Sequence, residues 1–348
     1  MAAIVSTPVV AYSTTSAWIA APAIGSGDFA WLEVATEDGD VRAVASFRGD
    51  RLLVRAAGKT TEVVHEPCTT VPCNTVQAPV AQSDASFAYA VAFPGTGGYV
   101  ASVTGAGAST VVAEDQTDPR LIATPHPVAV TGTTVVWVDN NAILSAPSAG
   151  GAATTLVTSD QAAGEITSIA ASAAGVAWSA RATAGGTLIG FRSSAGAIST
   201  RATEPDTAVA TLYSVALADD GTVVAIRRTL AKGRQQIALT AYALDGTPRT
   251  LLTSASFGKR DPFEVTRPSV AGTRVAVRLR GGKGGVDDEL WVADLATGST
   301  SRVTSVARSV ARLTDPSFGA GRLVWAKDEL TSRGRLLRAR LYSAAVKP

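Results

Sequence analysis

Short apolar runs separated by polar turns fill residues 214–253, and this pattern predicts four consecutive β-strands. The runs are rich in Val, Ile, Leu and Thr, and their composition and length favour strands over helices. Asp220-Gly221 and Asp245-Gly246 each follow a run, and glycine accepts the positive φ of a tight hairpin turn. The stretch therefore predicts an antiparallel four-stranded sheet with strands at residues 215–218, 223–226, 237–244 and 250–252.

The same unit recurs along the chain at a regular spacing. Its second strand follows a glycine and ends in an apolar anchor, and successive strong anchors are 41, 48, 51 and 48 residues apart. These anchors are Trp137, Trp178, Ile226, Val277 and Trp325. A four-stranded unit with a period of about 40–50 residues predicts the blades of a β-propeller.

The first part of the chain leaves the number of blades open. Weaker anchors at Trp18, Val54 and Tyr89 are only 36 and 35 residues apart, too close for whole blades, so two of them are expected to share a blade. We predict an all-β, seven-bladed propeller in a single domain over residues 1–348, with eight or six blades as alternatives. The last unit lacks an outermost strand. Residues 5–12 are expected to supply it, which closes the ring and removes an exposed strand edge.

Two stretches carry a resemblance to a known family. Pro268-Ser-Val-Ala-Gly-Thr-Arg-Val-Ala-Val and Asp315-Pro-Ser-Phe-Gly-Ala-Gly-Arg-Leu-Val-Trp resemble the repeat of TolB-like β-propellers. The turn that this family usually builds from Ser-Pro-Asp-Gly is present only as Ala218-Asp-Asp-Gly221. The resemblance implies a propeller fold. TolB-like propellers serve as binding modules of envelope complexes and as accessory domains of peptidases, and related propellers include sugar lyases.

Charge and hydropathy argue against nucleic-acid binding and against a membrane-spanning segment. The 31 basic and 29 acidic residues nearly cancel, and only 17% of the chain is charged, so the clustered basic field that binds nucleic acid is not expected. No apolar run reaches the roughly 18 residues of a membrane span. The N-terminus shows no signal-peptide pattern.

Cys68 and Cys73 are the two cysteines, and they lie in a proline-containing segment with four residues between them. The spacing differs from the C-x-x-C of redox motifs, and a zinc site would need further ligands at recognisable spacings. We predict a structural disulfide, with a metal pair or two free thiols as alternatives. A disulfide implies an oxidising compartment, so the protein is expected to be secreted or periplasmic.

The connections between blades are the predicted binding region. In a propeller, the segments from one blade's outermost strand to the next blade's innermost strand lie on one face, and loops on a rigid scaffold often carry function. We predict an exported, monomeric module that binds a protein or peptide there without catalysis or cofactor, with carbohydrate as a further ligand class. The predicted ligand-binding residues are Asp118, Arg120, Asp206, Arg260, Asp261, Arg267, Arg312 and Asp315.

The alternative is an enzyme of the propeller-lyase or hydrolase kind. It predicts that at least two of four carboxylates approach within about 5–10 Å, as paired-carboxylate chemistry requires. These are Asp118, Asp206, Asp261 and Asp315. Two histidines leave little material for a Ser-His-Asp triad.

Other motifs have ordinary structural interpretations. Oxygens at residues 37–40 and 139–141 are candidates for binding calcium, although Asp, Asn and Gly are common at turns. The cell-adhesion tripeptide Arg48-Gly49-Asp50 is interpreted as a repeat turn. The six tryptophans are expected to pack in the core rather than to form a carbohydrate platform.

Overall fold

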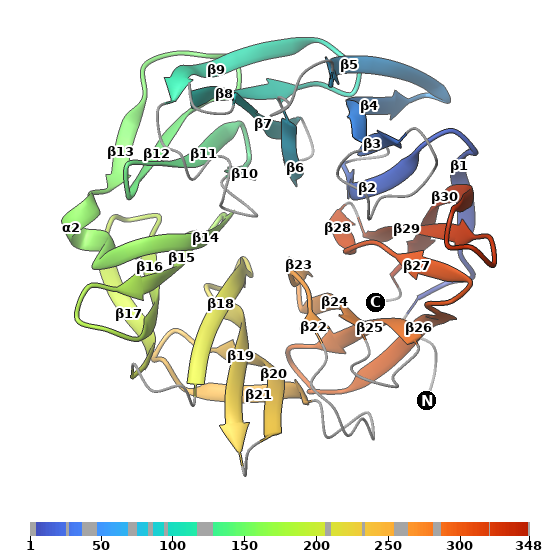
Figure 1. Cartoon of the computed structure of the whole chain (residues 1–348). Coiled ribbons are helices and arrows are strands. Elements are labelled where there is room, and N and C mark those ends of the chain that lie inside the picture. Colours follow the sequence, from blue (N-terminus) through green and yellow to red (C-terminus); the bar gives the residue numbers. More distant parts are fainter. Residues whose placement is uncertain are drawn as a thin grey trace. The chain divides into compact units, whose positions relative to one another are not determined.

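The chain folds into seven antiparallel β-sheets, which makes it a seven-bladed β-propeller of four-stranded blades, as the repeat predicts (Figure 1). The fold is known from a computed structural model. It describes residues 5–25, 28–36, 47–68, 75–82, 86–93, 97–116, 128–205, 210–231, 234–253, 264–280, 287–319 and 321–346. Within these residues, the single α-helix is α2 (Ser159–Ala162), which Thr158 and Gln161 cap.

Each of the first three blades is a run of four consecutive strands, numbered from innermost to outermost. Blade 1 consists of β2 (Trp18–Ile24), β3 (Phe29–Thr36), β4 (Phe47–Ala56) and β5 (Lys59–Pro67). Blade 2 consists of β6 (Thr75–Gln82), β7 (Phe87–Phe93), β8 (Gly97–Val103) and β9 (Ser109–Gln116). Blade 3 consists of β10 (Val128–Thr131), β11 (Thr134–Asp139), β12 (Ala142–Pro147) and β13 (Thr154–Val157).

Blades 4 and 5 follow the same plan, whereas the innermost strand of blades 6 and 7 is split in two. Blade 4 consists of β14 (Gly164–Ser172), β15 (Gly175–Ala182), β16 (Thr187–Ser193) and β17 (Ile198–Glu204). Blade 5 consists of β18 (Ala210–Leu217), β19 (Val223–Ala231), β20 (Arg234–Tyr242) and β21 (Pro248–Thr253). Blade 6 consists of β22 (Glu264–Val265), β23 (Ser269–Ala271), β24 (Arg274–Arg280), β25 (Asp287–Asp294) and β26 (Thr300–Ala307). Blade 7 consists of β27 (Ala311–Leu313), β28 (Ser317–Gly319), β29 (Arg322–Leu330), β30 (Leu336–Ala345) and β1 (Val9–Thr14).

The chain groups into two compact units. The first comprises Met1–Val135, Ala146–Ala153 and Val306–Pro348. The second comprises Val136–Ser145 and Thr154–Ser305.

Tryptophans of the second strands anchor the core, as expected. Trp31, Trp137 and Trp178 are at most 1% exposed, and Trp325 is 2% exposed. Trp178 packs directly on Gly190 of the next strand, where a Cβ atom would collide with the indole ring. The packing of large rings against small residues fills the blades at core density.

In blade 1, the strand that carries the anchor differs from the prediction. Its second strand is β3 and its anchor is Trp31, whereas Trp18 lies on the innermost strand and Val54 on the third. Two weak anchors therefore share this blade, as predicted, but neither is the true one. Gly49 lies within β4 rather than at a repeat turn, and its φ of 126° lets the chain pass close to the backbone of Glu66.

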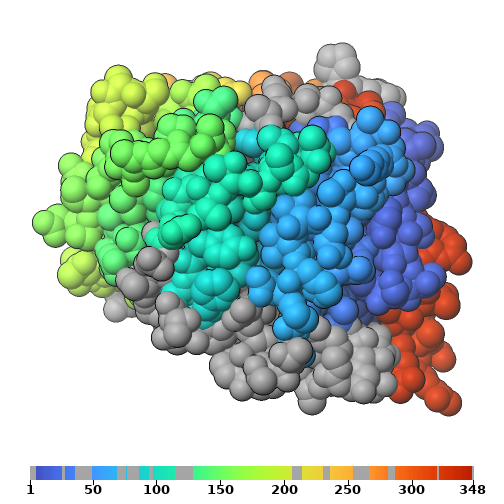
Figure 2. Space-filling model, turned by 90° about the horizontal axis from the view of Figure 1, so that it is seen from above, coloured from blue at the N-terminus to red at the C-terminus, as the bar shows by residue number. Residues whose placement is uncertain are grey.

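The N-terminal strand closes the last blade, which confirms the predicted closure. β1 pairs antiparallel with β30, with Val9 opposite Ser343 and Tyr12 opposite Leu341. Figure 2 shows the dark-blue N-terminal strands beside the red C-terminal segment. The pairing covers an edge of β30 that would otherwise offer unpaired backbone groups to another chain.

Within the described residues, no helix is long and apolar enough to cross a membrane.

Candidate binding site

Two predicted ligand-binding residues occupy equivalent positions on innermost strands. Arg267 lies between β22 and β23, and Asp315 lies between β27 and β28. Each is followed by a proline, Pro268 or Pro316, which has no N–H to donate to the ladder, so the strand is interrupted there. Both charged residues are half-buried.

A threonine before each charged residue keeps the interrupted strand attached to its neighbour. Thr266 donates its backbone N–H to the carbonyl of Arg278 at 3.1 Å. In blade 7, Thr314 N donates to the carbonyl of Ala326 at 3.0 Å, and Ala326 N donates back to Thr314 Oγ1 at 2.7 Å. The breaks are therefore ordered. They release a charged residue from the ladder while the preceding threonine stays bonded to the neighbouring strand.

Other innermost strands also depart from a regular ladder. β2 is bulged between Ala20 and Ala23, and β18 is bulged at Ser214, whose φ is 58°. Bulges bend a strand, re-aim its side chains and are frequent beside functional sites. Because innermost strands line the channel of a propeller, the repeated irregularity marks this part of each blade as the place to look for ligand contacts.

Arg312, a third predicted residue, links two neighbouring blades of the first unit. Its guanidinium carbon lies 5.5 Å from the centre of the Trp18 ring, in cation–π geometry. Across the ladder it faces Asp328, whose Oδ1 accepts the backbone N–H of Ile19 at 3.4 Å. Arg312 is half-buried and Trp18 is 5% exposed. The sequence identified Arg312 but not its partner Trp18.

Ion pairs order the charged side chains in the second unit. Arg181 Nη1 lies 3.0 Å from Glu165 Oε2 on adjacent strands of blade 4. Arg227 of blade 5 reaches Glu204 of blade 4 at 2.5 Å, and this hydrogen bond raises the pKa of Arg227. These pairs lie at the end of each blade where the chain leaves the outermost strand, which we call the loop end. They give that end a fixed pattern of charge.

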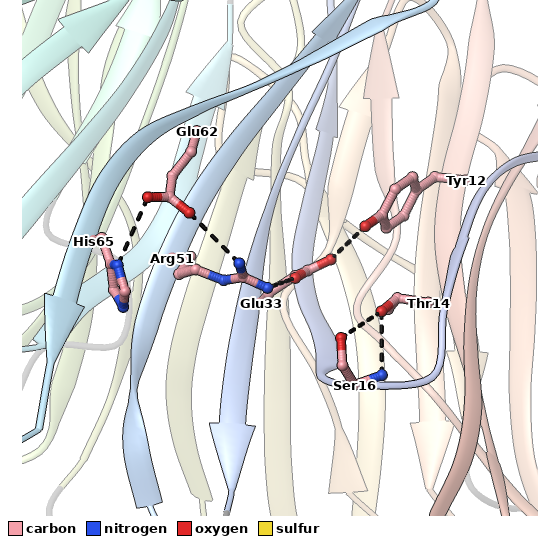
Figure 3. Close-up of polar contacts among 7 residues, drawn as sticks. All are labelled: Tyr12, Thr14, Ser16, Glu33, Arg51, Glu62 and His65. Carbon is pink, nitrogen blue, oxygen red and sulfur yellow. Dashed lines mark hydrogen bonds and ion pairs between the residues drawn. The ribbon is translucent and has the colours of Figure 1, made fainter.

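A buried polar network joins β1 to blade 1, and the sequence did not reveal it. Glu33 is 1% exposed, and its carboxylate accepts from Tyr12 Oη at 2.9 Å and from Arg51 Nη2 at 2.5 Å (Figure 3). Arg51 also lies 3.5 Å from Glu62, which lies 3.6 Å from His65 Nδ1. The available signal was a single acidic residue within the apolar strand Phe29–Thr36.

Burial controls the ionisation of Tyr12 in this network. Burial and the hydrogen bond to Glu33 raise the pKa of Tyr12 to about 12, so its hydroxyl stays protonated and remains a donor to Glu33. The Tyr12 ring also packs on Trp31, with centroids 4.6 Å apart. β1 is therefore held to blade 1 by a ring contact and by a hydrogen bond to a buried carboxylate.

Asp50 is a second buried acid that the sequence did not single out. It is 5% exposed, its Oδ2 accepts Val76 N at 3.2 Å, and it lies opposite Glu66 in the β4–β5 ladder. Burial raises its pKa to about 7 against the effect of the Val76 hydrogen bond, and the charge of Glu66 raises it further. A carboxyl group that titrates near neutrality can serve acid–base chemistry or support packing. Arg48-Gly49-Asp50 therefore lies within β4, with Asp50 in the ladder, rather than at an exposed repeat turn.

Several predictions fall outside the described residues and stay predictions. They include Cys73, the partner proposed for Cys68, and most of the predicted ligand contacts. The latter are Asp118, Arg120, Asp206, Arg260 and Asp261. The enzyme alternative depends on three of these, so the distances it requires remain predictions too.

Of the two stretches considered for calcium, only residues 139–141 are described. Asn140 and Asn141 have φ values of 47° and 64°, and Asn141 Oδ1 accepts the backbone N–H of Ile166 at 3.2 Å. This is the turn role that was expected of them. Within the described residues, no group of three or more His, Cys, Asp or Glu side chains could hold a metal ion.

Comparisons with known proteins identify the fold. No family model and no curated protein matches the chain. Among solved structures, the β-propeller domain of the Trilobed protease from Pyrococcus furiosus aligns with a TM-score of 0.57 and 9% identity, covering 94% of this chain and 95% of that domain. A puromycin-hydrolyzing peptidase of Mycobacterium tuberculosis aligns with a TM-score of 0.55 and 14% identity, covering 92% of this chain and 53% of the peptidase. An oligogalacturonate lyase aligns with a TM-score of 0.52 and 12% identity, covering 98% of this chain and 93% of the lyase.

These similarities establish the propeller architecture and no more, because every identity is far below 25%. The chain spans about half the length of the puromycin-hydrolyzing peptidase. By fold, the chain is a β-propeller similar to these three solved structures.

Proposed function

We propose that the chain is an exported, non-catalytic binding module of the TolB-like kind that recognises a protein or peptide at the loop ends of its blades. The observation that carries this proposal is that the innermost strand is interrupted in the same way in blade 6, at Arg267, and in blade 7, at Asp315. Arg312, stacked on Trp18, adds a third charged group on an innermost strand. Fixed charges on a rigid scaffold suit recognition, because little side-chain entropy is lost when a ligand binds.

A peptide selection tests the proposal. The full chain selects from a displayed library of random peptides, and calorimetry then measures the enriched peptides against Arg267→Ala and Asp315→Ala. Each substitution is expected to weaken binding about tenfold or more, as truncation of a central contact does. The matched controls, Arg249→Ala and Asp245→Ala, remove the same charges from exposed positions on or beside β21 and should leave binding unchanged.

Two results would contradict this function. One is a library from which no peptide is enriched, or whose peptides bind all four variants alike. The other is cleavage of a bound peptide by the wild-type chain, detected by mass spectrometry, because the module is proposed to be non-catalytic.

The compartment gives a separate prediction. The protein purified without reductant should fail to react with iodoacetamide when denatured, and should take up two labels after reduction, since it has two cysteines. Intact-mass measurement distinguishes the two states. Alkylation of both thiols without prior reduction would show that the two cysteines form no disulfide, and the argument for export would then fail.

An enzyme is the second candidate, and Asp50 is the observation that favours it. Its pKa of about 7 and its position opposite Glu66 give one carboxyl group that can exchange a proton near neutral pH. The oligogalacturonate lyase is a propeller of similar fold. Incubation with polygalacturonate should then release unsaturated products, at a rate that changes near pH 7 and is lost in Asp50→Asn. Absence of product across this pH range would remove the candidate.

A further inference from the structure

The last blade carries a charge unlike that of the rest of the chain. Residues 306–348 contain nine of the 31 basic residues but only three of the 29 acidic ones. The segment therefore has a net charge of +6 within a chain of net +2, and the remaining residues sum to −4. In Figure 2 the red C-terminal segment is uncovered on its outer side in the view shown.

Much of this positive charge lies at the turn between β29 and β30. Arg333, Arg335 and Arg338 are all exposed, and no ion pair to any of the three is found within the described residues. Glu329, which lies opposite Arg338 in the ladder, is already paired with Arg340 at 2.9 Å and with Lys327 at 3.4 Å. Among the residues that the structure describes, nothing compensates the charge of the three arginines.

The turn itself is ordered. Thr331 N donates to the carbonyl of Arg335 at 2.8 Å, and Gly334 N donates to the carbonyl of Thr331 at 2.9 Å. Arg335 N donates to Thr331 Oγ1 at 3.1 Å, and Gly334 has the left-handed φ of 77° that glycine adopts readily. The guanidinium groups are presented on a rigid hairpin rather than on a loose loop.

Two exposed apolar side chains accompany the arginines. Val310 is 57% exposed, and its carbonyl accepts the N–H of Leu330 at 2.7 Å, which places it at the base of this hairpin. Leu337 is 53% exposed at the start of β30. Val310 and Leu337 are attached two strands apart, a spacing of about 10 Å. We name the five residues Val310, Arg333, Arg335, Leu337 and Arg338 the arginine hairpin.

We propose that the arginine hairpin binds an acidic protein segment that also carries apolar side chains. This proposal deepens the proposed function, on which it rests, by giving the chemistry of the partner. Guanidinium groups bind carboxylates through two parallel hydrogen bonds. The exposed Val310 and Leu337 favour a partner with apolar side chains over a phosphate or uronate polymer.

The test uses defined peptides and the full chain. Fluorescence anisotropy measures the binding of a labelled peptide of alternating Glu and Leu. A second peptide has Gln in place of Glu, and a third has Gly in place of Leu. The first peptide should bind, and both changes should weaken its binding. Affinity should fall as salt rises, because exposed charges are screened.

Variants locate the contact. The triple substitution Arg333→Gln, Arg335→Gln and Arg338→Gln should weaken binding of the Glu–Leu peptide about tenfold or more. The triple change to lysine should restore part of it, because lysine keeps the charge but lacks the planar fork. Leu337→Ser should weaken binding by removing the apolar contact. The matched control carries Lys59→Gln, Arg228→Gln and Arg249→Gln, which remove the same charge from blades 1 and 5 and should leave binding intact.

Three outcomes would overturn the proposal. The first is that the Gln peptide binds as tightly as the Glu peptide, and the second is that the arginine triple variant binds like the control. The third is that polygalacturonate and single-stranded DNA bind through the arginines and that Leu337→Ser does not affect their binding. The last would make the surface a polyanion site. These outcomes are separate from failure of the proposed function: selected peptides that depend on Arg267 and Asp315 but not on the arginine hairpin would refute only the inference drawn here.

Discussion

Replacing Arg51 with leucine should lower the free energy of unfolding by about 3–5 kcal/mol, because it leaves the buried carboxylate of Glu33 without its cation. Glu33 is 1% exposed, and its other bond in the network comes from Tyr12. A neutral hydroxyl cannot replace a guanidinium beside a buried charge. Chemical denaturation at neutral pH, followed by circular dichroism, measures the loss.

A second substitution separates the charge effect from lost packing. Glu33→Gln in the Arg51→Leu background removes the unpaired charge and should recover a large part of the stability, so the two changes should be strongly non-additive. The control is Arg181→Leu, which breaks the exposed pair with Glu165 and should cost less than about 1 kcal/mol. If Arg51→Leu and Arg181→Leu cost the same, the network contributes no more than a surface ion pair.

Arg51→Leu should also loosen the attachment of β1, the strand that closes blade 7. Tyr12 lies on β1 and donates to the carboxylate that Arg51 holds in place, so displacement of Glu33 after the loss of Arg51 weakens one of the attachments between that strand and blade 1. Hydrogen exchange of the β1 amides should therefore rise before that of the other blades. The expected order links a side-chain network to the strand that removes the free edge of β30.

The architecture was predictable because a blade repeats its own pattern. Apolar anchors such as Trp137 and Trp325 recur at nearly constant spacing, and an outermost strand missing from the last unit implied a donor at the other end of the chain. Blade 1 was misread because two apolar strands flank its true second strand, and Trp18 imitates an anchor although it lies on β2. Periodicity identifies blades, but it cannot decide which of several similar strands is second.

The site was predictable only where a local signal exists. Thr314-Asp315-Pro316 and Thr266-Arg267-Pro268 combine a side chain that can hold the neighbouring strand with a proline that must leave the ladder, and both patterns are readable in the sequence. The contact of Arg312 with Trp18 joins residues that are nearly the whole chain apart. The bond from Tyr12 to Glu33 exists only because β1 completes blade 7. No pattern of neighbouring residues encodes such pairs.

Replacing Asp50 with asparagine should make the protein more stable above pH 7 and leave it nearly unchanged near pH 4. The pKa of Asp50 is raised from 3.8 to about 7, chiefly by burial, so folding favours the protonated acid. Stability associated with this group is fully present below pH 4, declines as the pH rises from 4 to 7, and is absent above. The difference corresponds to about 4 kcal/mol. Asparagine keeps an oxygen that can accept Val76 N and carries no charge at any of these pH values.

The measurement is the free energy of unfolding of both proteins from pH 4 to pH 8, because their difference cancels every other titrating group. Asp245→Asn is the control of opposite sign. The pKa of Asp245 is lowered by the backbone hydrogen bond from Thr247, so its contribution is present above its usual pKa and lost as the pH falls. That substitution should destabilise the protein at neutral pH. A stability difference for Asp50→Asn that does not change between pH 4 and pH 8 would mean that Asp50 is ionised in the folded protein. Asp50 could then not supply the proton that the enzyme alternative requires near neutral pH.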